Sequence, residues 1–174
     1  MSSHVKTLAA CGVGLAAGLV MGPVQSALAG HANSVLEAEL SGRNEVASGA
    51  TDNRIVGDPN GTGEIYVFGV DGDPTTLCYV LLVDGIAELD QAPGNGRAAH
   101  IHRGAEGANG PVEVNLAWPQ GGQAGDCLTE GETGKGLSAG EVQEILTNPE
   151  AFYVNVHNSE LPSGALRGQL DAQH

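Results

Sequence analysis

The sequence is short of basic residues and of aromatic ones. Lysine and arginine together number 7 of 174 residues, against 21 aspartates and glutamates, which gives a formal net charge of −14 at pH 7. A surface of this sign repels the phosphates of nucleic acids and the anionic head groups of membranes, so we expect neither as a partner. Phenylalanine, tryptophan and tyrosine make up only 3% of the chain, so the core must rest on valine, leucine and isoleucine.

Several catalytic signatures are also missing. The chain contains no Gly-x-Ser-x-Gly elbow, no phosphate-binding loop and no dinucleotide fingerprint. Its serines lie in turn or cap contexts, where nothing marks one of them as a nucleophile. The sequence therefore gives no positive sign of an enzyme, although it leaves that question open.

Long apolar runs are absent except near the N-terminus. Residues 1–29 have the pattern of a secretory signal peptide, with Lys6 in the charged region, an apolar stretch over residues 8–20 and a small-x-small cleavage site at residues 27–29. We therefore expect a mature domain over residues 30–174, secreted or periplasmic, with no membrane span after signal cleavage. Because Lys6 is the only charged residue in the predicted signal peptide, the mature domain has a net charge of −15.

Cysteine is scarce too. Cys11 falls inside the predicted signal peptide, which leaves Cys78 and Cys127. Export places this even pair in an oxidising compartment, so the sequence predicts one disulfide between them, worth roughly 4 kcal/mol in the chain-entropy model. Two thiolate metal ligands are the alternative, disfavoured because neither cysteine has a second cysteine or a histidine close in sequence.

Short runs with strand character recur between turns rich in glycine, proline, asparagine and aspartate. They cover residues 35–40, 64–70, 75–83, the run around 100–102, 112–116, 152–157 and 165–170. With no βαβ rhythm, this pattern predicts an all-β fold, an antiparallel Greek-key β-sandwich or barrel with one short helix.

The one predicted helix follows a glycine-rich stretch, residues 121–136, that we expect to be a loop. Ser138 has the position of an N-cap and Glu141 that of its capping-box partner, and the helix should end before Pro149. Its apolar stripe consists of Val142, Ile145 and Leu146.

Three histidines have a spacing that suggests a metal site. His100 and His102 stand one residue apart in an apolar run, so in a strand both side chains point to the same face, and His157 ends a second strand-like run. If the strands lie close, three neutral imidazoles would share one ion, with nitrogens about 3–4 Å apart and an open coordination position. Copper is favoured over zinc by export and by imidazole preference. The alternative is that these histidines are hydrogen-bonded structural residues, and the sequence does not say whether His31 or His174 joins them.

Two arginines, Arg103 and Arg167, are each followed by glycine. A guanidinium pairs well with a carboxylate, and we expect structural ion pairs with a residue such as Glu45 or Glu39.

Four motifs follow one another along the mature chain. They are Leu-Ser-Gly-Arg-Asn-Glu-Val at residues 40–46, Ala-His-Ile-His-Arg-Gly at 99–104 with Asn-Gly-Pro-Val at 109–112, Tyr-Val-Asn-Val-His at 153–157, and Gly-Ala-Leu-Arg-Gly-Gln-Leu at 164–170. In this order they resemble the motifs of the CHRD domain, the module repeated in chordin and found singly in many bacterial exported proteins. The departures are Ala47 for the usual proline, Asn158 for threonine and Ala165 for glutamate. The resemblance implies an extracytoplasmic β-sandwich and leaves the function undefined.

Three functions are compatible with these observations. The first is an exported metal-binding protein that binds, stores or delivers copper through His100, His102 and His157. The second is a structural or adhesive module that binds other extracytoplasmic proteins, as the resemblance to chordin allows. The third is a copper-dependent redox enzyme, because the His-x-His strand is similar to the copper-binding strand of copper–zinc superoxide dismutases. The bridging histidine and zinc-binding aspartate of those enzymes have no assignable counterparts in this sequence.

Overall fold

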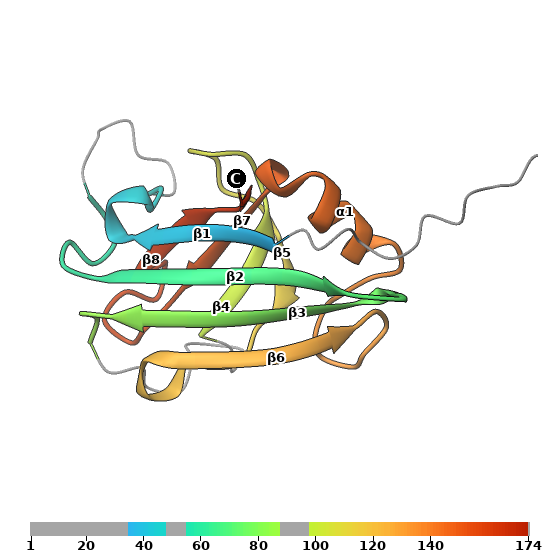
Figure 1. Ribbon diagram of the computed structural model, residues 1–174. Coiled ribbons are helices and arrows are strands. Elements are labelled where there is room, and N and C mark those ends of the chain that lie inside the picture. The colour runs from blue at the N-terminus through green and yellow to red at the C-terminus, as the bar shows by residue number, and fades with distance from the viewer. Residues whose placement is uncertain (1–34, 48–54, 88–97, 174) are drawn as a thin grey trace, which may run out of the picture.

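The computed structural model describes residues 35–47, 55–87 and 98–173 of the chain. The predicted signal peptide, His31 and His174 lie outside these residues. The described residues form one curled antiparallel sheet, a half-barrel, with one short α-helix (Figure 1). The predicted antiparallel all-β class with a single short helix is confirmed.

The sheet has nine strands. They are β1 (Val35–Ser41), β2 (Thr62–Val70), β3 (Asp73–Asp84), β4 (Ala99–Arg103), β5 (Val112–Asn115), β6 (Gln123–Thr129), β7 (Phe152–Val156), β8 (Leu166–Gln169) and β9 (Asp171–Ala172). The helices are α1 (Glu141–Thr147) and three 3₁₀ turns, η1 (Gly42–Asn44), η2 (Gln120–Gly122) and η3 (Pro149–Ala151). None of the described helices is long and apolar enough to cross a bilayer.

The strand order is β5-β4-β7-β8-β1-β2-β3-β6, with β9 paired to β1. We call β1, β2, β3 and β6 the long-strand half and β5, β4, β7 and β8 the short-strand half. In Figure 1 the long-strand half runs across the front and the short-strand half crosses behind it. The chain passes between the halves in the connections β3 to β4, β5 to β6 and, through α1, β6 to β7, so neighbours in the sheet are often distant in sequence.

The apolar core lies between the two halves. Buried side chains from both halves form it, among them Leu36, Ile65, Val67 and Leu81 from the long-strand half and Ile101, Val154, Val156 and Leu166 from the short-strand half. The predicted apolar stripe of α1 is buried against the same core. As the composition indicates, aliphatic side chains dominate this core, and burying each stabilises the fold by roughly 1.5–3 kcal/mol.

Strand β6 corrects the prediction of a loop over residues 121–136. Its sequence contains Gly125 and Asp126, both unfavourable in strands, yet it pairs with β3 along its whole length. Cys127 stands opposite Cys78 in this pairing, and the two form a disulfide. The predicted disulfide is therefore confirmed, and tertiary pairing overrides the weak local propensity of β6.

The start of α1 also differs from the prediction. The helix begins at Glu141, and its N-cap is Gly140, whose φ of 83° favours glycine. Ser138 lies further upstream, but its N–H donates to the Glu141 carboxylate at 2.7 Å, so one half of the predicted capping box is present. The helix ends before Pro149, as predicted.

Candidate metal centre

Two rows of side chains cross the short-strand half. In the antiparallel pairing, His100 stands opposite Asn155 and Asn155 opposite Arg167. The neighbouring row consists of His102, Tyr153 and Gln169. Directly opposed residues share a face of a sheet. These side chains therefore lie on one face, while Ile101 and Val154 between them point into the apolar core.

This second face is covered by loops rather than open to water. Tyr153, His100 and Arg167 are only 3%, 5% and 2% exposed, respectively. Backbone carbonyls of Gly104 and Gly110 accept hydrogen bonds from side chains of this face. We call the group the polar layer; it comprises Glu45, His100, His102, Tyr153, Asn155, His157, Arg167 and Gln169.

The structure brings His100, His102 and His157 together within the polar layer. Each offers a ring nitrogen, and these nitrogens all lie within 4.8 Å of one another. The ring centroid of His100 is 5.6 Å from that of His102 and 5.2 Å from that of His157. In both pairs the ring planes are steeply inclined to each other. An ion with bonds near 2 Å needs nitrogens about 3–4 Å apart. The widest separation in the cluster therefore exceeds the expected range, and binding would draw the most distant nitrogens together by up to about 2 Å.

Backbone carbonyls fix the tautomers of two of these histidines. His102 Nδ1 lies 3.0 Å from the Gly110 carbonyl oxygen, and His157 Nδ1 lies 3.1 Å from that of Pro162. A carbonyl only accepts, so each Nδ1 is the protonated donor and each Nε2 holds the lone pair. Both Nε2 atoms are buried with no hydrogen-bond partner in the described part of the chain. This is the arrangement that metal-binding histidines show.

Burial keeps these rings neutral. It lowers the pKa of His157 to about 4, with the hydrogen bond to Pro162 acting in the opposite direction. Burial is also the main reason that the pKa of His102 is lowered. At neutral pH both imidazoles are therefore in the form that binds a metal ion.

A stack of three side chains buttresses His102. Its ring lies parallel to that of Tyr153, with centroids 4.7 Å apart and planes inclined by 8°. The guanidinium carbon of Arg167 lies 3.5 Å from the Tyr153 ring centroid. The His102 ring and the Arg167 guanidinium both lie against the Tyr153 ring, so they must occupy opposite faces of it. The Tyr153 hydroxyl accepts a hydrogen bond from the Gly110 N–H at 3.2 Å, which fixes the middle of the stack.

Glu45 is the carboxylate of the polar layer. It accepts a hydrogen bond from the Asn155 side chain, and burial raises its pKa to about 7 although Arg167 and Asn155 act to lower it. A Cβ at Gly164, whose φ is 138°, would lie 2.5 Å from this carboxylate. Only glycine therefore fits at that position.

The donors of Arg167 point to neutral oxygens. They bond to the Asn109 side chain at 3.2 Å and to the backbone carbonyls of Ala105 and Ala108 at 3.2 and 2.7 Å. Arg167 and Glu45 interact electrostatically. Among the described residues, however, the hydrogen bonds of this guanidinium go to amide groups.

Arg103 lies apart from the polar layer. Its Nε donates to Glu113 at 3.0 Å, and its terminal nitrogens pair with Glu144 of α1. Its guanidinium also covers the Phe152 ring at 4.7 Å. Its carboxylate partners are thus Glu113 and Glu144, with Glu141 further away at 3.9 Å, in place of the expected Glu45 or Glu39. Glu144 comes 41 residues later, and no local pattern in the sequence points to it.

All four sequence motifs meet in and around the polar layer. Asn44 and Glu45 come from the first motif, and the Asn44 side chain donates to the Arg167 carbonyl at 3.2 Å. Asn109 of the second motif donates to the Val46 carbonyl at 3.0 Å. Asn155 of the third motif joins Glu45 of the first. The residues that carry the family resemblance therefore assemble this layer.

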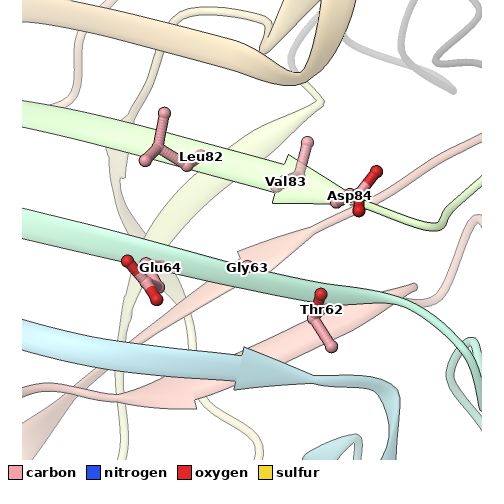
Figure 2. A pocket seen from close by; sticks show the side chains of 6 residues that line it. All are labelled: Thr62, Gly63, Glu64, Leu82, Val83 and Asp84. Carbon is pink, nitrogen blue, oxygen red and sulfur yellow. The ribbon is translucent and has the colours of Figure 1, made fainter.

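A hollow of about 250 Å³ lies elsewhere, on β2 and β3 (Figure 2). It is lined by Thr62, Gly63, Glu64, Leu82, Val83 and Asp84. Its walls carry aliphatic side chains and two carboxylates from separate strands. This lining offers no histidine or cysteine, so the histidine cluster is the better candidate for chemistry.

The comparisons with known proteins bear on this geometry. The family model described as the CHRD domain matches residues 36–170. No curated protein and no solved structure matches at a significant level. The matched segment contains every member of the polar layer, both cysteines of the disulfide and the three clustered histidines.

Proposed function

This chain belongs to the CHRD domain family, and we propose that it is an extracytoplasmic protein that binds copper through His100, His102 and His157. Its role is to bind, store or deliver the ion. The observation that supports this is the set of three ring nitrogens within 4.8 Å, two from β4 and one from the residue after β7. The buried Nε2 atoms of His102 and His157 add to it, because a buried nitrogen without a partner costs roughly 1–3 kcal/mol, which a bound ion would offset.

Copper is proposed ahead of zinc on chemical grounds. Nitrogen ligand sets bind copper more tightly than zinc, following the Irving–Williams order. The disulfide between Cys78 and Cys127 is consistent with an extracytoplasmic location. It also removes both thiolates from the ligand set, leaving imidazoles as the donors.

Three imidazoles leave a coordination position open. His100 is buried, whereas His102 and His157 are partly exposed although their Nε2 atoms are buried, so the latter two lie on the side of the site nearest to solvent. An open position suits an ion that is taken up and handed on.

Metal titration of the mature domain, residues 30–174, tests this proposal. Wild-type protein should bind one copper ion, and zinc more weakly, while His102→Ala and His157→Ala should each weaken copper binding by at least tenfold. Gln123→Ala, at an exposed position of β6 in the long-strand half, is the control and should bind as wild type. Equal stoichiometry and affinity in wild type and His102→Ala would rule the proposal out.

A structural or adhesive module is the second candidate. It is favoured by the hydrogen bonds of His102 to Gly110 and of His157 to Pro162, which tie two loops to the sheet without an ion. In that case alanine at either histidine lowers the melting temperature, and copper leaves the melting temperature of wild type unchanged. If the histidines bind copper, the melting temperature of wild type should instead rise with copper concentration. Turnover of superoxide or peroxide by the loaded protein would favour the redox enzyme.

A further inference from the structure

We propose that the three-histidine site selects monovalent copper, Cu(I), and that Arg167 sets this preference. The inference rests on the proposed function, since it concerns the charge of the ion that the site holds. It comes from the charges around the histidines rather than from the histidines alone.

The ligand set itself carries no negative charge. The cluster consists of His100, His102 and His157, without a carboxylate or thiolate. The Nδ1 protons of His102 and His157 are committed to backbone carbonyls, so neither ring becomes an anion on binding. The full charge of the ion is therefore added to a largely buried place, where each further unit of charge is costly to desolvate.

Arg167 adds a fixed positive charge beside this site. Its guanidinium carbon is 3.5 Å from the Tyr153 ring centroid, and that centroid is 4.7 Å from the centroid of the His102 ring. The two distances place the guanidinium no more than about 8 Å from the imidazole. Arg167 is 2% exposed, so water screens it poorly, and a guanidinium stays charged at any physiological pH.

Nearby carboxylates offset this charge only in part. The donors of Arg167 reach amide oxygens, and two carboxylates, Glu45 and Glu106, act on it electrostatically. Burial raises the pKa of Glu45 to about 7. Glu45 is therefore only partly ionised at neutral pH. Glu113 also acts on His102 electrostatically, but its carboxylate is engaged by Arg103 at 3.0 Å.

The consequence is a penalty on divalent ions. For an ion about 8 Å from the guanidinium, a separation of the same order as that to the His102 ring, one extra unit of charge at an effective permittivity of about 20 would weaken binding roughly 30-fold. Cu(I) avoids this penalty and accepts a three-coordinate imidazole site, whereas Cu(II) and Zn(II) both incur it.

Chelator competition tests the proposal on the mature domain. Cu(I) is titrated anaerobically against a chromophoric Cu(I) chelator, and Cu(II) and Zn(II) against chelators of matched affinity. Wild type should bind Cu(I) more tightly than either divalent ion. Arg167→Gln should shift the Cu(I)-to-Cu(II) affinity ratio about 30-fold towards Cu(II), which lowers the reduction potential of the bound copper by about 90 mV at 59 mV per tenfold.

Two further variants separate charge from folding. Arg167→Lys keeps the charge and should keep the ratio within a few fold of wild type. Arg43→Gln removes an exposed charge and should leave the ratio unchanged. If circular dichroism shows that Arg167→Gln does not fold, the selectivity is tested by comparing the wild-type affinities for Cu(I), Cu(II) and Zn(II).

The outcomes distinguish this inference from the function on which it rests. Cu(II) or Zn(II) binding as tightly as Cu(I) in wild type would overturn the selectivity while leaving a three-histidine metal site. A folded Arg167→Gln with the wild-type ratio would overturn the role of Arg167. Absence of histidine-dependent binding of any of the three ions would instead contradict the proposed function.

Discussion

The two halves of the sheet differ in how far their outer faces are exposed to solvent. In the long-strand half the inner face packs on the core, while outward residues such as Glu39, Glu64, Val80 and Leu82 are exposed. In the short-strand half β7 is buried along its whole length, because the loops cover its outer face as well. The difference shows where the chain uses polar burial. The outer face of the long-strand half is exposed to solvent, whereas the short-strand half holds titratable groups, among them the histidine cluster, between the sheet and its loops.

The largest expected effect tests whether the halves are independent. Replacing both cysteines of the Cys78–Cys127 disulfide by alanine should lower the free energy of unfolding by about 4 kcal/mol, because the crosslink closes a separation of 49 residues. Copper affinity should stay within a few fold of wild type, since the disulfide joins β3 to β6 in the long-strand half. Denaturant unfolding and copper titration measure the two quantities. A tenfold or larger loss of affinity would show that the halves are coupled.

Next in size is the effect of breaking the polar layer. Asn155→Leu keeps the branching of the side chain, with bulkier methyl groups, and leaves the buried Glu45 carboxyl without its amide donor, at about 2–3 kcal/mol. The matched control on the wet face is Tyr66→Phe, which removes a hydroxyl bonded to Glu64 at 3.3 Å and should cost less than about 0.5 kcal/mol. Denaturant midpoints compare the two variants. Equal losses would mean that the polar layer is no more critical than the exposed face.

The pH dependence of stability sharpens the contrast further. The pKa of His157 is 6.5 in the unfolded chain and about 4 in the folded protein. The free energy of unfolding therefore decreases as the pH drops from 6.5 to 4. Burial of Glu45 has the opposite effect on the pH dependence, because it raises the pKa of this carboxyl from 4.5 to about 7. The contribution of Glu45 to stability is therefore lost as the pH rises from 4.5 to 7. His157→Gln should therefore remove an acid-side loss of the order of 2 kcal/mol, allowing for partial solvent screening. Unfolding curves of both proteins from pH 4 to 8 measure this, and parallel profiles would refute it.

The smallest expected effect concerns the stack behind His102. Tyr153→Leu removes the ring between His102 and Arg167 and should weaken copper binding about tenfold. Tyr153→Phe keeps the ring and loses only the acceptor for the Gly110 N–H, so its affinity should remain near wild type. Copper titration compares the pair. If phenylalanine and leucine reduce affinity equally, the stacked ring is not what positions His102.

The pattern of neighbouring residues in the sequence predicted those parts of the fold that depend on short-range interactions. Alternation of side chains placed His100 and His102 on one face, and the apolar stripe of α1 matched its buried face. Strand β6 was missed because Gly125 and Asp126 disfavour a strand, and only pairing with β3 holds it. Of the candidate site, the clustering of His100, His102 and His157 was predicted.

What the sequence did not reveal depends on long-range contacts. Gly110 and Pro162 contribute backbone carbonyls, which leave no signature in residue types. The position of Tyr153 beneath His102 requires the register of β4 against β7, and the partner of Arg103 on α1 requires the path of the chain between the halves. Such arrangements follow from topology, so residue patterns alone do not supply them.

Copper X-ray absorption spectroscopy of the loaded mature domain is the most direct test of whether His100, His102 and His157 bind copper. We expect three nitrogen ligands near 2 Å with the outer-shell scattering of imidazole, reduced to two imidazoles in His157→Ala. A first shell whose imidazole scattering is absent, or unchanged by removal of His157, would contradict it.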